Sequence, residues 1–209
     1  MAPLKINTMP ETCDASLSGL FARKCGHKPK QGVSKKWYFN IDDVDRVATQ
    51  MINRATKVTA LVLKAGAKIY PAEGSSKTKK VKHALSVGDF ANGYTHTDEF
   101  TVTYRGEDEA ERIQELVDGA RVGTINKMVD TGANGETSYR IAGLESGMEI
   151  INDDFDSTNN SGATTLIVAT KEGEEEGTAL KIFLMAASVE PTDLEETEAW
   201  ITANEFVPA

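Results

Sequence analysis

The stretch from residue 95 to residue 128 restricts the fold of this chain more than any other. Residues 97–104 alternate apolar and polar side chains, which predicts a half-buried strand. Residues 107–119 predict a helix, and residues 121–129 predict a second strand. A short helix between two strands buries its apolar stripe only by lying on a sheet, so this stretch favours a sheet-based fold.

The predicted helix has recognisable ends and a single apolar stripe. Asp108 is the expected N-cap, and the acidic residues around it suit the positive end of the helix dipole. Gly119 is the expected C-cap, because glycine adopts the left-handed conformation that ends many helices. The stripe that faces the sheet consists of Ala110, Ile113, Leu116 and Val117.

The rest of the chain predicts short strands joined by turns. The expected strands cover residues 56–63, 67–70, 124–128, 137–142, 147–151, 163–170 and 178–186. We expect the first two to pair through Gly66, and the next two to pair through the Asn134-Gly135 turn. The last two, which are the clearest, are expected to form a closing hairpin. Residues 71–82 are expected to be a polar loop.

These elements predict a mainly β (α+β) protein, an antiparallel β-sandwich or barrel with one flanking helix. Residues 1–36 are expected to be an extended N-terminal arm, residues 37–190 the sandwich domain, and residues 191–209 a C-terminal extension. The arm carries seven basic and two acidic residues, whereas residues 170–209 carry two basic and ten acidic residues. The two ends of the chain are therefore oppositely charged.

The C-terminal extension contains a second helical pattern. Residues 192–196 resemble a capping box after Pro191. Leu194, Trp200 and Ile201 predict a short amphipathic helix.

The overall charge and hydropathy exclude several classes of protein. The net charge is −9 and the isoelectric point is about 4.9, which argues against a general nucleic-acid binder but not against a protein past which DNA slides. No run of about 18 apolar residues predicts a membrane span. The first 25 residues lack the apolar region of a secretory signal, so nothing indicates export.

No catalytic, cofactor or metal site is predicted, and we expect the protein not to be an enzyme. Cys13 and Cys25 are either two thiols or one local disulfide, and Cys25 with His27 is a weak metal pair. Residues 152–160 resemble a calcium loop, but Ser157 and Ala163 stand where that loop needs glycine and glutamate, which favours a solvated turn. A catalytic triad assembled only in space stays open.

A subunit interface is predicted from an aromatic cluster next to the arm and from two charged segments. Aromatic anchors are common in subunit contacts, and the same cluster could instead lie in the core or form a ligand platform. The lysine-rich segment could instead bind phosphate, pair with acidic neighbours or stay solvated. The predicted interface residues are Trp37, Tyr38, Phe39, Lys77, Lys79, Lys80, Lys82, Glu174, Glu175 and Glu176.

A family resemblance is carried by several segments in order, which together cover about 130 residues. They are Cys13-Asp14 with the following Leu-Ser-Gly-Leu, residues 39–44, residues 60–70, the strand, helix and strand of residues 97–129, and residues 139–147. These segments resemble the tail tube and related tail structural proteins of tailed bacteriophages, of the kind found in phages of gut Bacteroidales.

This resemblance implies a tail-tube fold of two packed antiparallel sheets, a flanking helix and extended arms. It also implies hexameric rings, stacked into a tube through which DNA passes without sequence-specific binding. The implied partners are copies of the chain and other tail or connector proteins, in a virion assembled in the bacterial cytoplasm. The alternatives are a head–tail connector ring, a capsid-decorating protein, an injection-system tube, and an enzyme or small-ligand binder on a β-sandwich.

Overall fold

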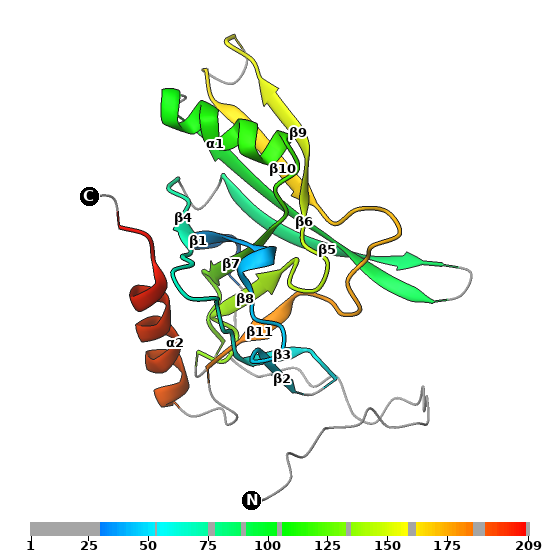
Figure 1. Cartoon of the computed structure of the whole chain (residues 1–209), viewed down its shortest axis with the longest axis vertical. Coiled ribbons are helices and arrows are strands. Elements are labelled where there is room, and N and C mark those ends of the chain that lie inside the picture. The colour runs from blue at the N-terminus through cyan, green and yellow to red at the C-terminus, as the bar shows by residue number, and fades with distance from the viewer. Residues whose placement is uncertain are drawn as a thin grey trace, which may run out of the picture.

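Two open β-sheets form the framework of the protein, which is mainly β with two helices (Figure 1). The structure, a computed structural model, describes residues 30–52, 54–74, 78–88, 91–103, 106–132, 135–158, 162–185 and 191–207. Within these residues, one sheet has seven strands in the order β2-β3-β11-β8-β7-β1-β4, and the other has four in the order β5-β6-β10-β9.

The element bounds are as follows. The strands of the seven-stranded sheet are β1 (Val33–Asn40), β2 (Gln50–Ile52), β3 (Lys57–Ala60), β4 (Tyr70–Pro71), β7 (Val122–Met128), β8 (Tyr139–Ala142) and β11 (Lys181–Phe183). Those of the four-stranded sheet are β5 (Lys79–Val87), β6 (Asn92–Val102), β9 (Glu149–Phe155) and β10 (Thr164–Ala169). The helices are α1 (Glu107–Val117), α2 (Pro191–Asn204) and the 3-10 turn η1 (Ile41–Asp43).

Strand β1 is covered on both faces. Trp37 and Phe39, which are 4% and 0% exposed, lie in the core on the α2 side. Lys36 and Tyr38 point the other way and contact Asp98 of the four-stranded sheet. The expected boundary of the N-terminal arm at residue 36 therefore falls inside β1, because the exposed polar residues Ser34 and Lys35 at the start of this strand resemble a polar arm.

Helix α2 packs on the seven-stranded sheet (Figure 1). Ile201 is 3% exposed, and the Trp200 ring lies edge-on to Phe183 with ring centroids 5.5 Å apart. Leu194 packs against the same core. The helix predicted after Pro191 is confirmed, but the expectation of an extended C-terminal arm is wrong for residues 191–204, because the apolar stripe of the helix is buried on its own chain.

Helix α1 is confirmed over residues 107–117 and adds to a second core. Leu116 packs against a cluster that contains Val122, Met148 and Val168, and Ile113 is buried. Ala110 is exposed and Val117 is 53% exposed, so two members of the predicted stripe lie outside this core.

The ends of α1 correct one prediction and confirm another. Gly106, not Asp108, is the N-cap, and its N–H donates to the Glu109 carboxylate at 3.1 Å. Gly119 follows the helix with φ at +107°, a conformation that favours glycine and ends the helix as predicted.

Two predicted strand pairings are wrong and one is confirmed. Strands β10 and β11 lie in different sheets and form no closing hairpin, and β11 instead pairs parallel with β3 and antiparallel with β8. Tyr70 pairs with β1, not with residues 56–63. The hairpin of β7 and β8 is confirmed. Proximity in sequence favoured the wrong pairs because successive strands can enter different layers of a β-sandwich.

Two strands lie where polar loops were expected. Strand β5 begins at Lys79, inside the expected loop of residues 71–82. Strand β9 extends through residues 152–155, where a solvated acidic turn or a calcium loop was considered. Both are edge strands, and an edge strand tolerates charged side chains because it meets solvent.

Candidate self-assembly surface

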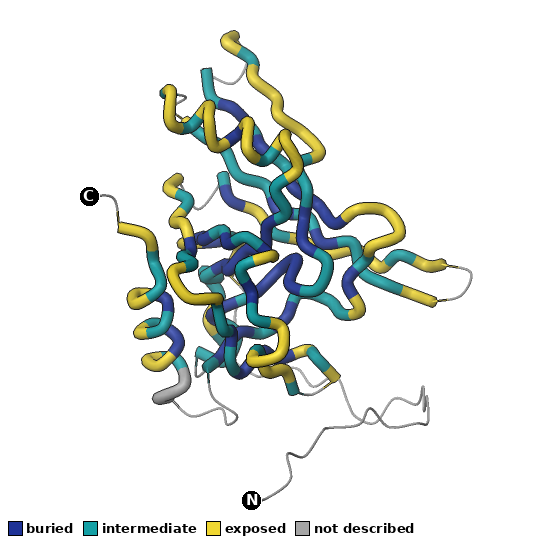
Figure 2. The backbone as a smooth tube through the Cα atoms, viewed as in Figure 1, coloured by how far each residue is buried: buried dark blue, intermediate teal, exposed yellow. Residues whose placement is uncertain are grey.

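The four-stranded sheet ends in two strands that no other described strand flanks, β5 and β9. The hairpin of β5 and β6 extends away from the seven-stranded sheet, and β9 forms the opposite edge (Figure 1). Most residues of both edge strands are exposed (Figure 2). Open edges of this kind offer backbone N–H and C=O groups to another strand.

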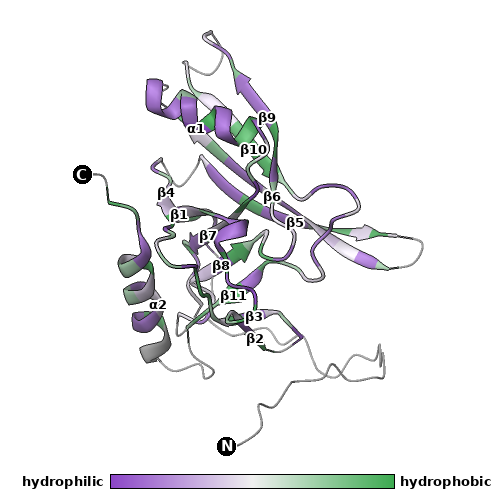
Figure 3. Ribbon diagram, in the orientation of Figure 1, coloured by the Kyte–Doolittle hydropathy of each residue, from purple (hydrophilic) through white to green (hydrophobic). Residues whose placement is uncertain are grey.

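The two edges carry opposite charge. Lys80 and Lys82 are exposed on β5, and Asp153 and Asp154 are exposed on β9. Hydrophilic residues dominate the exposed part of β9 and recur along β5 (Figure 3). Lys80 forms an ion pair of 2.6 Å with Glu99 of β6, whereas Lys82 forms no ion pair with any residue that the structure describes. A basic edge and an acidic edge on one sheet are complementary to each other.

Each edge has two distinct faces. Asp98 faces the seven-stranded sheet, and its cross-strand neighbours share its face, so Val81, His83 and Leu85 also lie there. On β9 the same face carries Asp153 and Phe155, which lie opposite Leu166 and Thr164 of β10. The opposite face carries Lys80, Lys82, Asn152 and Asp154.

A buried ion pair holds the two sheets together. Lys36 of β1 donates to the Asp98 carboxylate of β6, and both side chains are 0% exposed. Lys36 Nζ also donates to the backbone oxygens of Lys80 at 3.2 Å and Glu99 at 3.0 Å. Burial lowers the pKa of Lys36 and raises the pKa of Asp98, and the attraction between the two groups opposes both shifts.

Asp98 is held from the seven-stranded sheet as well. The Tyr38 hydroxyl donates to Oδ1 at 3.1 Å, and the Thr124 hydroxyl donates to Oδ2 at 2.9 Å. Burial raises the pKa of Tyr38 far above its usual value, so it remains a donor. A carboxylate with several donors and one cation is well satisfied, and the loss of one partner leaves a buried charge uncompensated.

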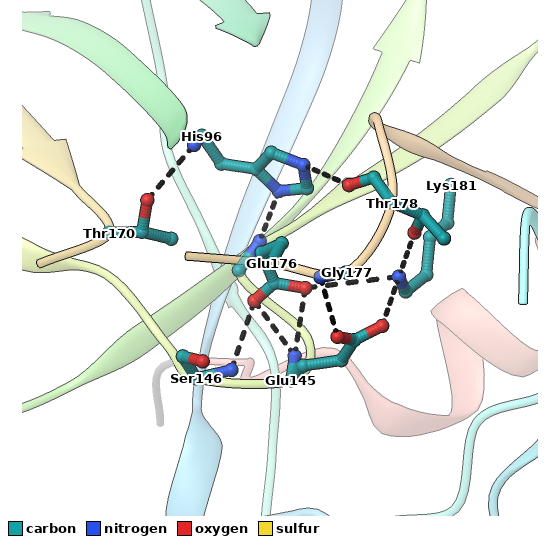
Figure 4. A network of polar contacts seen from close by, with 9 residues as sticks. His96, Glu145, Ser146, Thr170, Glu176, Gly177, Thr178 and Lys181 are labelled. Carbon is teal, nitrogen blue, oxygen red and sulfur yellow. Dashed lines mark hydrogen bonds and ion pairs between the residues drawn. The ribbon is translucent and has the colours of Figure 1, made fainter. Parts of the chain in front are cut away.

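A second polar network supports the base of the β5–β6 hairpin (Figure 4). His96 of β6 is 0% exposed, and its Nε2 lies 2.9 Å from the Thr178 carbonyl. The Gly143 N–H donates to Nδ1 at 3.1 Å, which requires a neutral ring protonated on Nε2. Burial lowers the pKa of His96 to about 4.

The same network fixes the loop of residues 171–177 on β6. The buried Glu176 carboxylate accepts the N–H groups of Glu145 at 2.9 Å and Ser146 at 3.0 Å (Figure 4). The backbone of Glu176 exchanges two hydrogen bonds with Tyr94, at 2.8 and 3.0 Å. Lys181 donates to Glu145 at 2.6 Å. The loop thereby supports the projecting hairpin from the side.

The predicted interface residues separate into buried and exposed groups. Trp37, Phe39, Lys79 and Glu176 are buried within the chain, and the half-buried Tyr38 donates to Asp98, so their observed contacts lie within the chain. Trp37 and Phe39 lie in the core on the α2 side, whereas Lys79 Nζ donates to the Ser34 carbonyl of the other sheet at 3.1 Å. Lys77 lies outside the described residues.

Four predicted interface residues remain accessible. Lys80, Lys82 and Glu174 are exposed, and Glu175 is half-buried. Glu174 lies 3.4 Å from Arg121, and Glu175 accepts from the Ser86 hydroxyl at 3.2 Å. The sequence prediction placed a strand at residues 147–151 but missed the second half of β9, residues 152–155, and did not include β9 in the interface. The available signal was the pair of apolar residues Ile151 and Phe155, which the acidic residues between them obscured.

The described residues show no centre for metal chemistry. Among them, no group of three or more His, Cys, Asp or Glu side chains could hold a metal ion. Cys13, Cys25 and His27 lie outside the described part of the chain. In that part, neither helix has the length and apolar character needed to cross a membrane. Comparison with known proteins yields no matching family model, curated protein or solved structure.

Proposed function

We propose that this chain is a structural subunit of a phage tail tube that assembles with copies of itself into stacked, hexameric rings in a virion. The observation that supports the proposal is the four-stranded sheet, which is open at two edges of opposite charge. A sheet that its neighbours complete is suited to self-assembly, so the proposed role is structural.

The strand directions suit a closed ring. Every neighbouring pair in the order β5-β6-β10-β9 is antiparallel, so β5 and β9 also run in opposite directions. When β5 of a second copy lies beside β9 of the first, the antiparallel alternation continues without interruption. Such a contact joins two different surfaces, and repetition of it closes into a ring or winds into a filament. Either product covers the open edges.

The face of the four-stranded sheet that points away from the seven-stranded sheet suits a channel wall. None of its polar side chains is buried, and they include Lys80, Lys82, Thr97, Glu99, Thr101, Asp154 and Thr165; Ala84, Ile167 and the buried Ala169 lie on the same face. Hydroxyl groups and charges of both signs offer DNA little net attraction, and the chain as a whole carries a net charge of −9. DNA would therefore pass along such a wall without being held.

Electron microscopy and light scattering of the full chain at high concentration test this proposal. Stacked rings with six copies are the expected result. Rings with twelve copies would favour the head–tail connector over the tail tube, and binding to a capsid lattice would favour the decorating protein. A monodisperse monomer at every concentration would contradict self-assembly, and turnover or ligand binding by that monomer would favour an enzyme or binder.

A further inference from the structure

We infer that β5 of one copy pairs with β9 of the next in one antiparallel register, in which His83 lies opposite Asp153. The inference rests on the proposed function, because it names the contact through which copies of the chain join. Three properties of the two edges select the register: the direction of the backbone groups, the faces of the side chains and their chemistry.

The hydrogen bonds of β5 decide which of its backbone groups point to the open edge. The Thr101 N–H donates to the Thr78 carbonyl at 3.2 Å, so these residues form a hydrogen-bonded pair at the start of the β5–β6 ladder. Hydrogen-bonded and non-hydrogen-bonded pairs alternate along an antiparallel ladder. The odd-numbered residues Val81, His83 and Leu85 therefore direct their N–H and C=O groups away from β6.

The same reasoning applies to β9. The Thr170 N–H donates to a β6 carbonyl at 3.0 Å, which identifies the even-numbered residues of β10 as bonded to β6. Thr165 consequently turns its backbone groups to β9, where it lies opposite Asp154. The neighbours of Asp154, which are Asp153 and Phe155, then direct their N–H and C=O groups to the open edge.

Only odd-numbered residues of the two strands can therefore exchange backbone hydrogen bonds across the contact. Permitted registers consequently differ by steps of two residues. The side-chain faces agree with this condition. His83 and Asp153 both lie on the face toward the seven-stranded sheet, and Lys82 and Asp154 both lie on the opposite face. The joined sheets then have continuous faces.

Side-chain chemistry selects one register from this series. With His83 opposite Asp153, Lys82 lies opposite Asp154 and Val81 lies opposite Phe155. A slip of two residues in one direction places Val81 opposite Asp153, and a slip in the other places Leu85 there. Each slip puts an aliphatic side chain against the Asp153 carboxylate. The first slip moves Asp154 from Lys82 to Lys80, which is already paired with Glu99. The second leaves Asp154 opposite Ala84 and moves Lys82 to Asp156, beyond the end of β9.

The selected register also covers exposed apolar surface. Leu85 and Ile151 are 56% and 63% exposed. Ile151 lies at the β-bulge of β9, and the selected register brings Leu85 beside it. Two exposed aliphatic side chains on the two partner edges are thus buried against each other by the same contact.

Disulfide trapping between separate molecules tests the register. In a background with Cys13→Ser and Cys25→Ser, one protein carries Ala84→Cys and another carries Asn152→Cys. These positions form a non-hydrogen-bonded pair in the selected register, with Cα atoms about 4.5 Å apart, which a disulfide can bridge. Lys82 and Asp154 remain in place. We expect mixing and mild oxidation to give a cross-linked dimer on a non-reducing gel.

The matched control combines Asn152→Cys with Ser86→Cys, which corresponds to one of the slipped registers and also leaves Lys82 and Asp154 in place. In the selected register these two positions are about 7 Å apart or more, beyond the reach of a disulfide, so the dimer should be lost. If electron microscopy shows rings but the cross-link forms only in the control pair, or in neither pair, the register is wrong and the proposed function still stands. If no rings form, the proposed function is contradicted, whether or not the cross-link forms. If the cross-link is also missing, the register is overturned as well.

Discussion

Charged side chains have opposite environments in two regions of this protein, the contact between the two sheets and the free edges of the four-stranded sheet. Where the sheets meet, charges are buried in pairs, as in Lys36 with Asp98. At the free edges of the four-stranded sheet, charges of one sign face solvent on β5 and charges of the other sign face solvent on β9. The first arrangement is buried within one chain, whereas the second is accessible to a neighbour. This contrast separates residues that maintain the fold from residues that would join subunits.

The strongest test of the contrast is removal of one member of the buried pair. We expect Asp98→Ala to lower the free energy of unfolding by about 3–5 kcal/mol, because Lys36 is left buried without its counter-charge. Urea denaturation measures the effect. The double variant Lys36→Met with Asp98→Leu should recover most of the loss, since no unpaired charge remains. A small loss in Asp98→Ala would show that water reaches Lys36.

The two helices offer a second test, because one buries its stripe more completely than the other. Ile201→Ala in α2 should lower the free energy of unfolding by about 2–4 kcal/mol, since Ile201 is 3% exposed. The matched control is Val117→Ala in α1, which is 53% exposed and should change stability by about 0.5 kcal/mol or less. Equal effects in thermal or urea unfolding would mean that α2 contributes no more to the core than an exposed site.

Acid should weaken the network at the base of the hairpin. The pKa of His96 is about 4 when folded, against about 6.5 when unfolded, so the unfolded chain binds the proton more readily between these values. Stability is therefore complete above about pH 6.5 and falls as the pH decreases, by about 2 kcal/mol at pH 5. The difference between the wild-type chain and His96→Gln, measured by urea unfolding at several pH values, isolates this residue. A difference that is independent of pH would contradict the assignment.

Charge reversal at one edge should have the smallest effect per contact and leave the fold intact. Lys82→Asp places like charges opposite each other and should weaken each contact by about 1 kcal/mol or less at low salt, which raises the concentration needed for assembly. Lys82→Asp combined with Asp154→Lys should restore assembly. Sedimentation measures the assembled fraction, and urea unfolding should be unchanged. A loss that the exchange does not rescue would place Lys82 outside the contact.

Local patterns were enough to predict several elements of the fold. The helix at residues 107–117 follows from a 3.6-residue stripe, its end follows from Gly119, and the β7–β8 hairpin follows from an Asn-Gly turn. Helix α2 was predictable in the same way. In each case the residues that determine the element are close together in the chain, so their spacing contains the necessary information.

The predictions failed where a residue's role depends on a distant strand. For Trp37 and Phe39 the sequence left the core and a subunit interface open, and the structure buries both in the core on the α2 side. Glu176 looked like part of a solvated acidic turn, but its carboxylate is buried against two backbone N–H groups. The second half of β9, residues 152–155, was predicted as a turn from its acidic residues, which a strand at a sheet edge tolerates. Composition cannot distinguish a buried charge from an exposed one when the partner is 30 or more residues away.

The sequence by itself determined the predominance of strands, the two helices, the β7–β8 hairpin and the acidic character of the chain. These depend on periodicity, turn residues and residue counts, which are local or additive properties. Only the tertiary structure decided which strands share a sheet, which charges are buried, and that a basic and an acidic edge lie at opposite ends of the same sheet. Those properties arise from contacts between residues far apart in the chain. The fold, and not the spacing of residues in the sequence, determines which of these residues are in contact.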